Sequence, residues 1–267
     1  MSRMMKYSFL LLLLLMTVGC NAMQTKGGST LDRIQERGQL ILGTSGNMPT
    51  MTQVDAQGKV SGFDIDIARL MADVMEVKLV TEVMPFNELL PALESGKVDV
   101  VISNVTITPK RNLRVAFVGP YMRSGKCFVT KNASLAKAEN SQDLNTPETR
   151  LAVLNGSTSE DVARGLFPQA TLVTVESYAK AAEMVKNDEV GGMLTDYPIC
   201  MATLKANPEA GFVSLFSLLT YEPIGIALPA NDAQFINWTD NFLDRLDGTD
   251  TLKGLGKRWF GEVQVTE

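Results

Sequence analysis

The segment VDVVISNVTITPKR occupies residues 98–111, and its first half decides the fold class. Val98 to Ile102 is an apolar run with one charged residue, which is typical of a strand in a sheet that is covered on both faces. Sheets of that kind are built from parallel strands connected by helices. The segment therefore predicts an α/β fold, in which strands and helices should alternate on either side of it.

Strand-like and helix-like segments alternate before residue 98. Ile67, Leu70, Met71 and Val74 recur at helical spacing and predict a helix with one buried face. The other elements predicted in this part are strands at 40–43 and 77–83 and a helix around 89–93 that ends near Gly96.

The alternation starts again after residue 125. Ser157 to Glu160 fits a capping box, so a helix should begin there. The remaining predicted elements are strands at 126–130, 151–154, 171–175, 192–195 and 224–228, helices at 177–186 and from about Pro198, and two closing helices between 235 and 259. This order predicts mostly parallel sheets with helices on both faces.

Composition excludes several classes of function. The chain has 267 residues, 45% hydrophobic and 21% charged, which suits one large domain or two smaller ones. Its net charge of −5 argues against a nucleic-acid partner, which would require a basic surface. It contains no histidine, which removes His-based catalytic triads and most zinc sites. We expect no metal and no cofactor.

The N-terminus has the pattern of a processing signal. Arg3 and Lys6 precede an apolar run from Phe9 to Met16, which is too short to span a bilayer. The sequence Thr17-Val18-Gly19-Cys20 resembles the lipobox of bacterial lipoproteins, although Thr17 replaces the usual leucine. We therefore predict a signal peptide at 1–19, lipidation of Cys20 and a flexible tether at 20–29. The alternative is an ordinary secretory signal with an incidental cysteine.

Cys127 and Cys200 are the two other cysteines, and each lies in an apolar stretch. A secreted chain could join them in a disulfide. Free cysteines are also common in buried apolar surroundings, so the sequence leaves both states open.

Three motifs carry a family resemblance across the mature chain. They are Gly62-Phe63-Asp64-Ile65-Asp66-Ile67-Ala68, the run from Phe86 to Asp99, and Ser103-Asn104-Val105-Thr106-Ile107-Thr108-Pro109-Lys110-Arg111 followed by Phe117 to Tyr121. In order and spacing they are similar to family 3 of the extracellular solute-binding proteins, the amino-acid-binding group. The resemblance implies the two-lobed (type II) periplasmic-binding-protein fold. Lobe 1 would hold 30–124 and 222–267, lobe 2 would hold 127–219, and two hinge crossings would lie near 124–126 and 220–222.

The resemblance also implies a binding site for the two charges of a free amino acid. Arg111 would bind the carboxylate through both oxygens, because guanidinium is planar and stays charged. Thr106 would add a hydroxyl beside it. Asn104 and Asp196 would hold the ammonium, and Asp196 follows an apolar strand, where open α/β sheets bind ligands. Alternatively, Asp196 caps the helix that begins near Pro198.

Further residues would complete the cleft. Thr158 and Ser157 lie at a predicted helix start, where free N–H groups favour an anion. Phe86 would form an aromatic wall, or else pack in the core. Met48 stands where the basic-amino-acid receptors have a tyrosine, and Ser45 where they have an aspartate. The absence of that aspartate favours a neutral ligand.

The predicted function is capture of a free amino acid, by closure of the cleft, for delivery to an ABC importer. The protein would be a monomer outside the cytoplasm, anchored to the membrane by its lipid, in the periplasm or at the cell surface. One alternative is an enzyme, a cyclohexadienyl dehydratase acting on prephenate or arogenate, with Asp196 or Glu222 as the acid. A second is a ligand sensor for a signalling partner.

Overall fold

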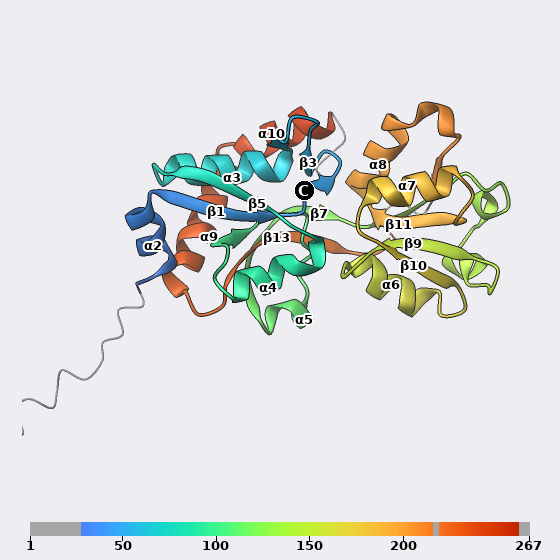
Figure 1. Cartoon of the computed structure of the whole chain (residues 1–267), viewed down its shortest axis with the longest axis horizontal. Helices are drawn as coiled ribbons and strands as arrows, with labels where there is room; N and C mark the ends of the chain where they lie inside the picture. The colour runs from blue at the N-terminus through green and yellow to red at the C-terminus, as the bar shows by residue number, and fades with distance from the viewer. Residues whose placement is uncertain (1–27, 216–218, 262–267) are drawn as a thin grey trace, which may run out of the picture.

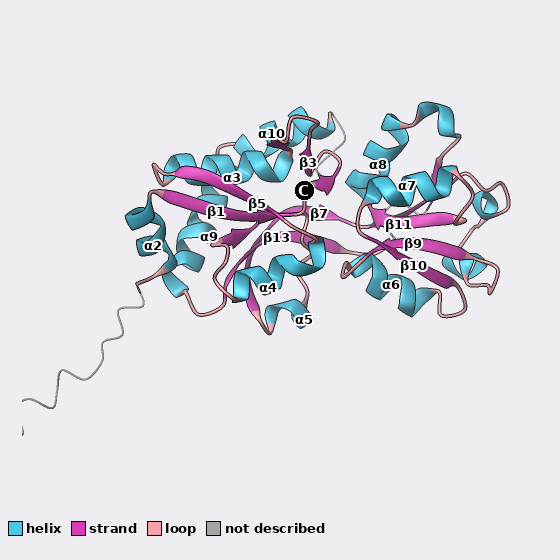
Figure 2. Ribbon diagram, in the orientation of Figure 1, coloured by secondary structure: helices cyan, strands magenta, loops and turns pink. Residues whose placement is uncertain are grey.

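The computed structural model describes residues 28–215 and 219–261, which form two α/β lobes side by side (Figure 1). The predicted signal peptide, Cys20 and most of the predicted tether lie outside these ranges. Each lobe has a five-stranded sheet with helices on both of its faces (Figure 2). The predicted α/β class is therefore confirmed.

The sheet of lobe 1 has the order β5-β1-β6-β13-β7. Its strands are β5 (Lys78–Val83), β1 (Gln39–Thr44), β6 (Val100–Val101), β13 (Glu222–Pro229) and β7 (Val115–Ser124). β1 pairs in parallel with β5 and β6, whereas β13 is antiparallel to both β6 and β7. Four strands therefore run in one direction and β13 alone runs against them, as expected for a mostly parallel sheet.

Helices and a small second sheet cover lobe 1. The helices are α2 (Thr30–Arg37), α3 (Phe63–Val74), α4 (Leu89–Glu94), α5 (Pro109–Asn112), α9 (Ala233–Gly248) and α10 (Thr251–Phe260), with a 3-10 turn η1 (Phe86–Glu88) before α4. The small sheet consists of β2 (Asn47–Met48), β3 (Thr52–Val54) and β4 (Val60–Ser61).

Lobe 2 repeats the arrangement in the order β10-β9-β11-β8-β12. Its strands are β10 (Thr171–Val175), β9 (Arg150–Leu154), β11 (Gly192–Asp196), β8 (Lys126–Thr130) and β12 (Val213–Leu215). Here β8 is the strand that runs against the others. Its helices are α6 (Thr158–Leu166), α7 (Tyr178–Lys186) and α8 (Tyr197–Ala206), with 3-10 turns η2 (Leu135–Lys137), η3 (Ser141–Leu144) and η4 (Pro208–Ala210).

The two reversed strands begin where the chain passes between the lobes. β7 ends at Ser124 and β8 begins at Lys126, so Gly125 alone separates a lobe 1 strand from a lobe 2 strand. The return passage ends at Glu222, which lies opposite Ser124 in the β13–β7 pairing. Lys126 and Glu222 are thus the first residues of the two strands that leave the crossings.

Local details differ from the predictions in two places. The strand predicted at 98–102 is only Val100–Val101, because the Asp99 carboxylate accepts the Ile41 N–H at 2.8 Å in place of a backbone carbonyl. The capping box is half formed. Ser157 accepts the Glu160 N–H, but the Glu160 carboxylate accepts from Gly156 at 2.9 Å. The helix nevertheless begins at Thr158.

Two further features of the described residues are the pairing of the cysteines and the length of the apolar helices. Cys127 of β8 is joined to Cys200 of α8 by a disulfide. In the described ranges, no helix is both long and apolar enough to cross a bilayer.

The apolar core continues across the boundary between the lobes. The main cluster of buried side chains fills lobe 1, and it includes Leu154, Tyr178 and Ile199 from lobe 2. Two smaller clusters lie on the two faces of the lobe 2 sheet. Because apolar burial is favourable in proportion to area, these shared contacts stabilise the arrangement in which the lobes touch.

Candidate functional site between the lobes

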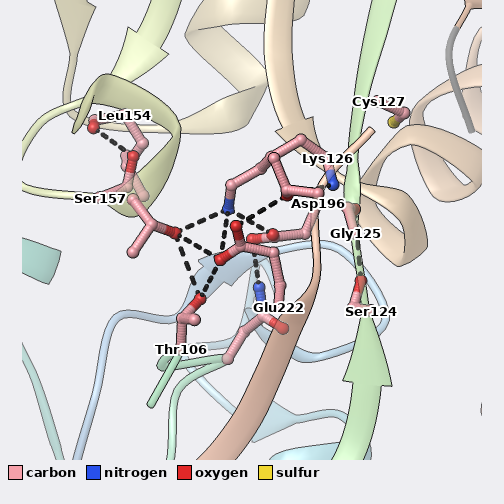
Figure 3. A network of polar contacts seen from close by, with 12 residues as sticks. Thr106, Ser124, Gly125, Lys126, Cys127, Leu154, Ser157, Asp196 and Glu222 are labelled. Carbon is pink, nitrogen blue, oxygen red and sulfur yellow. Dashed lines mark hydrogen bonds and ion pairs between the residues drawn. The ribbon is translucent and has the colours of Figure 1, made fainter. Parts of the chain in front are cut away.

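The polar side chains predicted for ligand binding meet where the lobes touch, beside the two crossings (Figure 3). Lobe 1 supplies Asn104 and Thr106 from the loop after β6, and Arg111 from α5. Lobe 2 supplies Thr158 from the start of α6 and Asp196 from the end of β11. Both lobes therefore contribute to one cluster, as a cleft-closure mechanism requires.

Asp196 faces the cluster and does not cap a helix. α8 begins at the next residue, but no hydrogen bond joins the Asp196 side chain to its N-terminal turn. One carboxylate oxygen accepts Asn104 Nδ2–H at 2.9 Å, across the boundary between the lobes. The other oxygen lies 2.5 Å from Lys126 Nζ. The helix-cap alternative is thus not observed.

Lys126 is a member of the cluster that the sequence analysis did not single out. Its side chain is 0% exposed, and Nζ contacts Asp196, Thr158 Oγ1 at 2.7 Å and Glu222 Oε2 at 3.4 Å. Two of the three N–H donors of the ammonium make hydrogen bonds, to Asp196 and Thr158, and Glu222 adds a second opposite charge. A signal was available, because a charged residue in a predicted buried strand needs a partner.

Glu222 lies on the other side of the same ammonium. Its Oε2 accepts hydroxyl hydrogen bonds from Thr106 at 2.9 Å and Thr158 at 3.0 Å, and its Oε1 accepts from Thr220 at 2.8 Å. Burial by itself raises the pKa of this carboxyl, but Lys126 and the three hydroxyls outweigh burial and lower the pKa below its usual value. Glu222 is therefore ionised at neutral pH.

Arg111 lies at the outer edge of the cluster. Its guanidinium donates to Thr106 O at 2.9 Å and to Gly156 O, in the other lobe, at 3.2 Å. It also lies over the ring of Phe86, 5.6 Å from the centroid. Burial lowers the pKa of Arg111, while nearby Asp161, Asp196 and Glu222 act in the opposite direction. Arginine nevertheless stays charged at any physiological pH.

Asn104 connects the cluster to a second buried carboxylate. Its backbone is left-handed, with φ of 49°, and its N–H donates to Asp64 Oδ2 at 2.7 Å. Asp64 Oδ1 accepts from the Tyr121 hydroxyl at 2.9 Å. Burial raises the pKa of Asp64 to about 7, although these two hydrogen bonds act to lower it. The Asn104 side-chain oxygen is buried and has no hydrogen-bond partner.

The remaining predicted residues are buried in the apolar core or are bonded within one lobe. Phe86 and Met48 are buried in the shared apolar cluster, which also contains Tyr178 of α7. Ser45 is buried and its hydroxyl accepts from Ser103 at 3.0 Å. The Ser157 hydroxyl is used within lobe 2, where it accepts the Glu160 N–H and donates to Leu154 O. The sequence analysis did not identify Tyr178.

In the described part of the chain, no three Cys, Asp or Glu side chains lie together in a way that could hold a metal ion. The chemistry offered by the cluster is that of charge recognition. One ammonium, two carboxylates and two hydroxyls are buried, where electrostatic interactions are strong, and one half-buried guanidinium lies at their edge.

The chain is similar to several known proteins over most of its length. The glutamine-binding protein of Geobacillus stearothermophilus is 30% identical over 213 residues, covering 78% of this chain and 79% of the relative. A cyclohexadienyl dehydratase of Pseudomonas aeruginosa is 24% identical over 231 residues, covering 86% of both chains. A putative binding component of an ABC transporter from Wolinella succinogenes, solved in complex with lysine, is 34% identical with a TM-score of 0.81, covering 85% of this chain and 97% of that one.

Residues 40–262 match the sequence profile of the bacterial extracellular solute-binding proteins, family 3. That range includes every residue of the cluster and both five-stranded sheets except Gln39, the first residue of β1. The predicted resemblance and the predicted two-lobed fold are thereby confirmed. The chain belongs to family 3 of the bacterial extracellular solute-binding proteins.

Proposed function

We propose that this protein captures a free amino acid between its lobes and delivers it to an ABC importer. The observation that carries the proposal is the meeting, at the boundary between the lobes, of a lobe 1 guanidinium and a lobe 2 carboxylate. Arg111 and Asp196 have the charges that an amino-acid zwitterion needs; Asp196 is buried and Arg111 is half-buried. The glutamine-binding and lysine-complexed relatives support the same class of ligand.

Each part of the ligand has a proposed partner. The carboxylate binds Arg111 and the hydroxyls of Thr106 and Thr158. The ammonium binds Asp196 and the side-chain oxygen of Asn104, which is buried and has no hydrogen-bond partner. An unsatisfied buried acceptor is costly, so a ligand that donates to it gains affinity.

The wall residues favour a neutral side chain on the ligand. Phe86, Met48 and Tyr178 provide apolar surface, and Ser45 provides only a hydroxyl. A cationic side chain would need a carboxylate that these residues do not offer. Ser157 contributes by starting α6, whose first-turn N–H groups favour an anion, because its own hydroxyl already caps the helix and its own N–H donates to Leu154 O.

The proposal extends to the setting of the protein. Cleavage after residue 19 and lipidation of Cys20 would anchor a monomer to the membrane, in the periplasm or at the cell surface. We keep the predicted lobe boundaries, 30–124 with 222–267 and 127–219, as part of the proposal.

The test is thermal melting of the mature chain carrying Cys20→Ser, against the twenty amino acids, prephenate and arogenate. A ligand present at about 100 times its Kd stabilises the folded state by about 2.7 kcal/mol. We expect a clear rise in Tm with one or a few neutral amino acids. No rise with any amino acid would contradict the proposal.

The dehydratase alternative has one relative in its favour and one observation against it. The Pseudomonas aeruginosa relative is such an enzyme. However, the pKa of Glu222 is lowered, because Lys126 and three hydroxyls outweigh burial, so this residue is poorly suited to donate a proton. A rise in Tm with prephenate or arogenate alone would favour the enzyme.

A further inference from the structure

Two of the chain's own side chains hold the groups that the proposed ligand needs. Lys126 Nζ contacts Asp196, the proposed partner of the ligand ammonium, at 2.5 Å. Glu222 Oε2 accepts from Thr106 and Thr158, the proposed partners of the ligand carboxylate, at 2.9 and 3.0 Å. An ammonium and a carboxylate from the protein therefore contact proposed ligand partners in both halves of the head-group site (Figure 3).

The backbone explains why these two side chains meet there. Lys126 lies directly opposite Asp196 in the antiparallel pairing of β8 with β11. Glu222 lies opposite Ser124 in the pairing of β13 with β7. Ser124 precedes Lys126 by two residues in the chain. The two crossings thus bring the pair to the junction of the lobes. The 3.4 Å separation of Lys126 Nζ and Glu222 Oε2 makes them an ion pair.

The pair also connects the lobes to each other. Glu222 Oε2 is bonded at once to Thr106 of lobe 1 and Thr158 of lobe 2. Lys126 Nζ donates to Thr158 and Asp196 of lobe 2. Asp196 also accepts a hydrogen bond from Asn104 of lobe 1. These are the contacts that a bound ligand would make in a closed cleft.

We propose that Lys126 and Glu222 form an internal competitor that mimics an amino-acid head group and holds the cleft closed until a ligand displaces it. This inference rests on the proposed function, because it takes Asp196, Thr106 and Thr158 as ligand groups. The displaced ammonium and carboxylate pair with each other, so neither is left buried alone. Only molecules whose cleft is open can bind ligand, so the competitor reduces the apparent affinity in proportion to the open fraction.

The pair also sets selectivity. A ligand must bring both an ammonium and a carboxylate to replace what the pair supplies. A 2-oxo acid of the same side chain lacks the ammonium and cannot take Asp196 from Lys126. Zwitterions are therefore selected over their deaminated analogues.

The test is the double variant Lys126→Met/Glu222→Gln, which removes both charges and keeps the side-chain volumes similar. The matched control is Lys180→Met/Glu183→Gln, which removes a lysine–glutamate pair that is half exposed on lobe 2. Calorimetry with the amino acid that raises Tm the most should show binding about tenfold tighter in the double variant and unchanged binding in the control. If the double variant does not fold, Lys126→Gln/Glu222→Gln takes its place, because it also removes both charges, and the same direction is expected.

Small-angle scattering without ligand provides an independent readout. We expect the wild-type radius of gyration to match the closed form, whereas that of the double variant should be larger and should fall when ligand is added. Equal or weaker binding by the double variant, or equal radii without ligand, would overturn the inference. Binding of a 2-oxo acid in preference to its amino acid by the wild type would also overturn it. If no amino acid binds either protein, the proposed function fails, and the scattering comparison still decides whether the pair closes the cleft.

Discussion

Asp64 in lobe 1 and Glu222 at the hinge are both buried carboxylates, yet their pKa values shift in opposite directions. Asp64 receives hydrogen bonds from Asn104 and Tyr121, and no cation is among the groups that shift its pKa, which rises to about 7. Glu222 receives three hydroxyl hydrogen bonds and faces Lys126, and its pKa is lowered. The difference teaches that two neutral donors do not offset the cost of burying a carboxylate, whereas a cation at 3.4 Å together with three hydroxyl donors does.

Arg111 extends the comparison to the ligand, because we expect its guanidinium to pair with the buried carboxylate of the bound amino acid. Arg111→Ala should weaken amino-acid binding by about 3–5 kcal/mol, since the ligand carboxylate would be buried without its charged partner. Titration calorimetry measures the change. Arg114→Ala is the control, because Arg114 is exposed and pairs with Glu94. A loss below about tenfold, which is 1.4 kcal/mol, would remove Arg111 from the site.

Asp64 should make the folded protein less stable as pH rises. Its folded-state pKa of about 7 lies above the ordinary value of 3.8, so the folded protein keeps a proton between these values that the unfolded chain has released. The stabilisation is complete below about pH 4 and is lost as pH rises through about 7, a change of about 4 kcal/mol. Asp64→Asn should remove it. Urea unfolding of both proteins between pH 4.5 and 8 measures the difference, and parallel curves would show that Asp64 is ionised throughout.

The disulfide supports the hinge side of the comparison. Cys127 follows Lys126, and Cys200 lies in the helix that follows Asp196. The bond therefore restrains the two parts of lobe 2 that carry the Lys126–Asp196 ion pair. The double variant Cys127→Ala/Cys200→Ala should lower the free energy of unfolding by about 2–4 kcal/mol, the usual value for a disulfide. The change should appear in urea unfolding at pH 7. A stability equal to that of the wild type would show that the bond does not form in solution.

Motifs in the sequence were sufficient to predict much of the site. Arg111, Thr106, Asn104, Thr158 and Asp196 each follow a predicted strand or begin a predicted helix, and the fold brings them together at the lobe boundary. Their roles toward a ligand remain predictions. Periodicity also predicted the α/β order, since apolar runs and helical spacing are local properties of the chain.

The ion pair of the cluster could not be predicted in the same way. Which carboxylates face Lys126 depends on the register of β8 with β11 and of β13 with β7, and residues 96 positions apart in the sequence meet through it. Strand ends have the same limitation. β6 is shorter than predicted because the Asp99 side chain replaces a backbone acceptor, a contact with Ile41 that no local pattern contains.

Glu222 should show the smallest effect, with a pH dependence opposite to that of Asp64. Because its folded-state pKa lies below the ordinary value of 4.5, ionised Glu222 contributes stability above that value, and the contribution is lost as pH falls through the folded-state pKa. Glu222→Gln should therefore flatten the acid side of the stability curve and leave its slope between pH 5 and 8 unchanged. Unfolding measured from pH 2.5 to 8 would separate the two carboxylates. If Glu222→Gln changed the slope near neutrality instead, the pKa of Glu222 would have to be raised, and Lys126 would not be neutralising it.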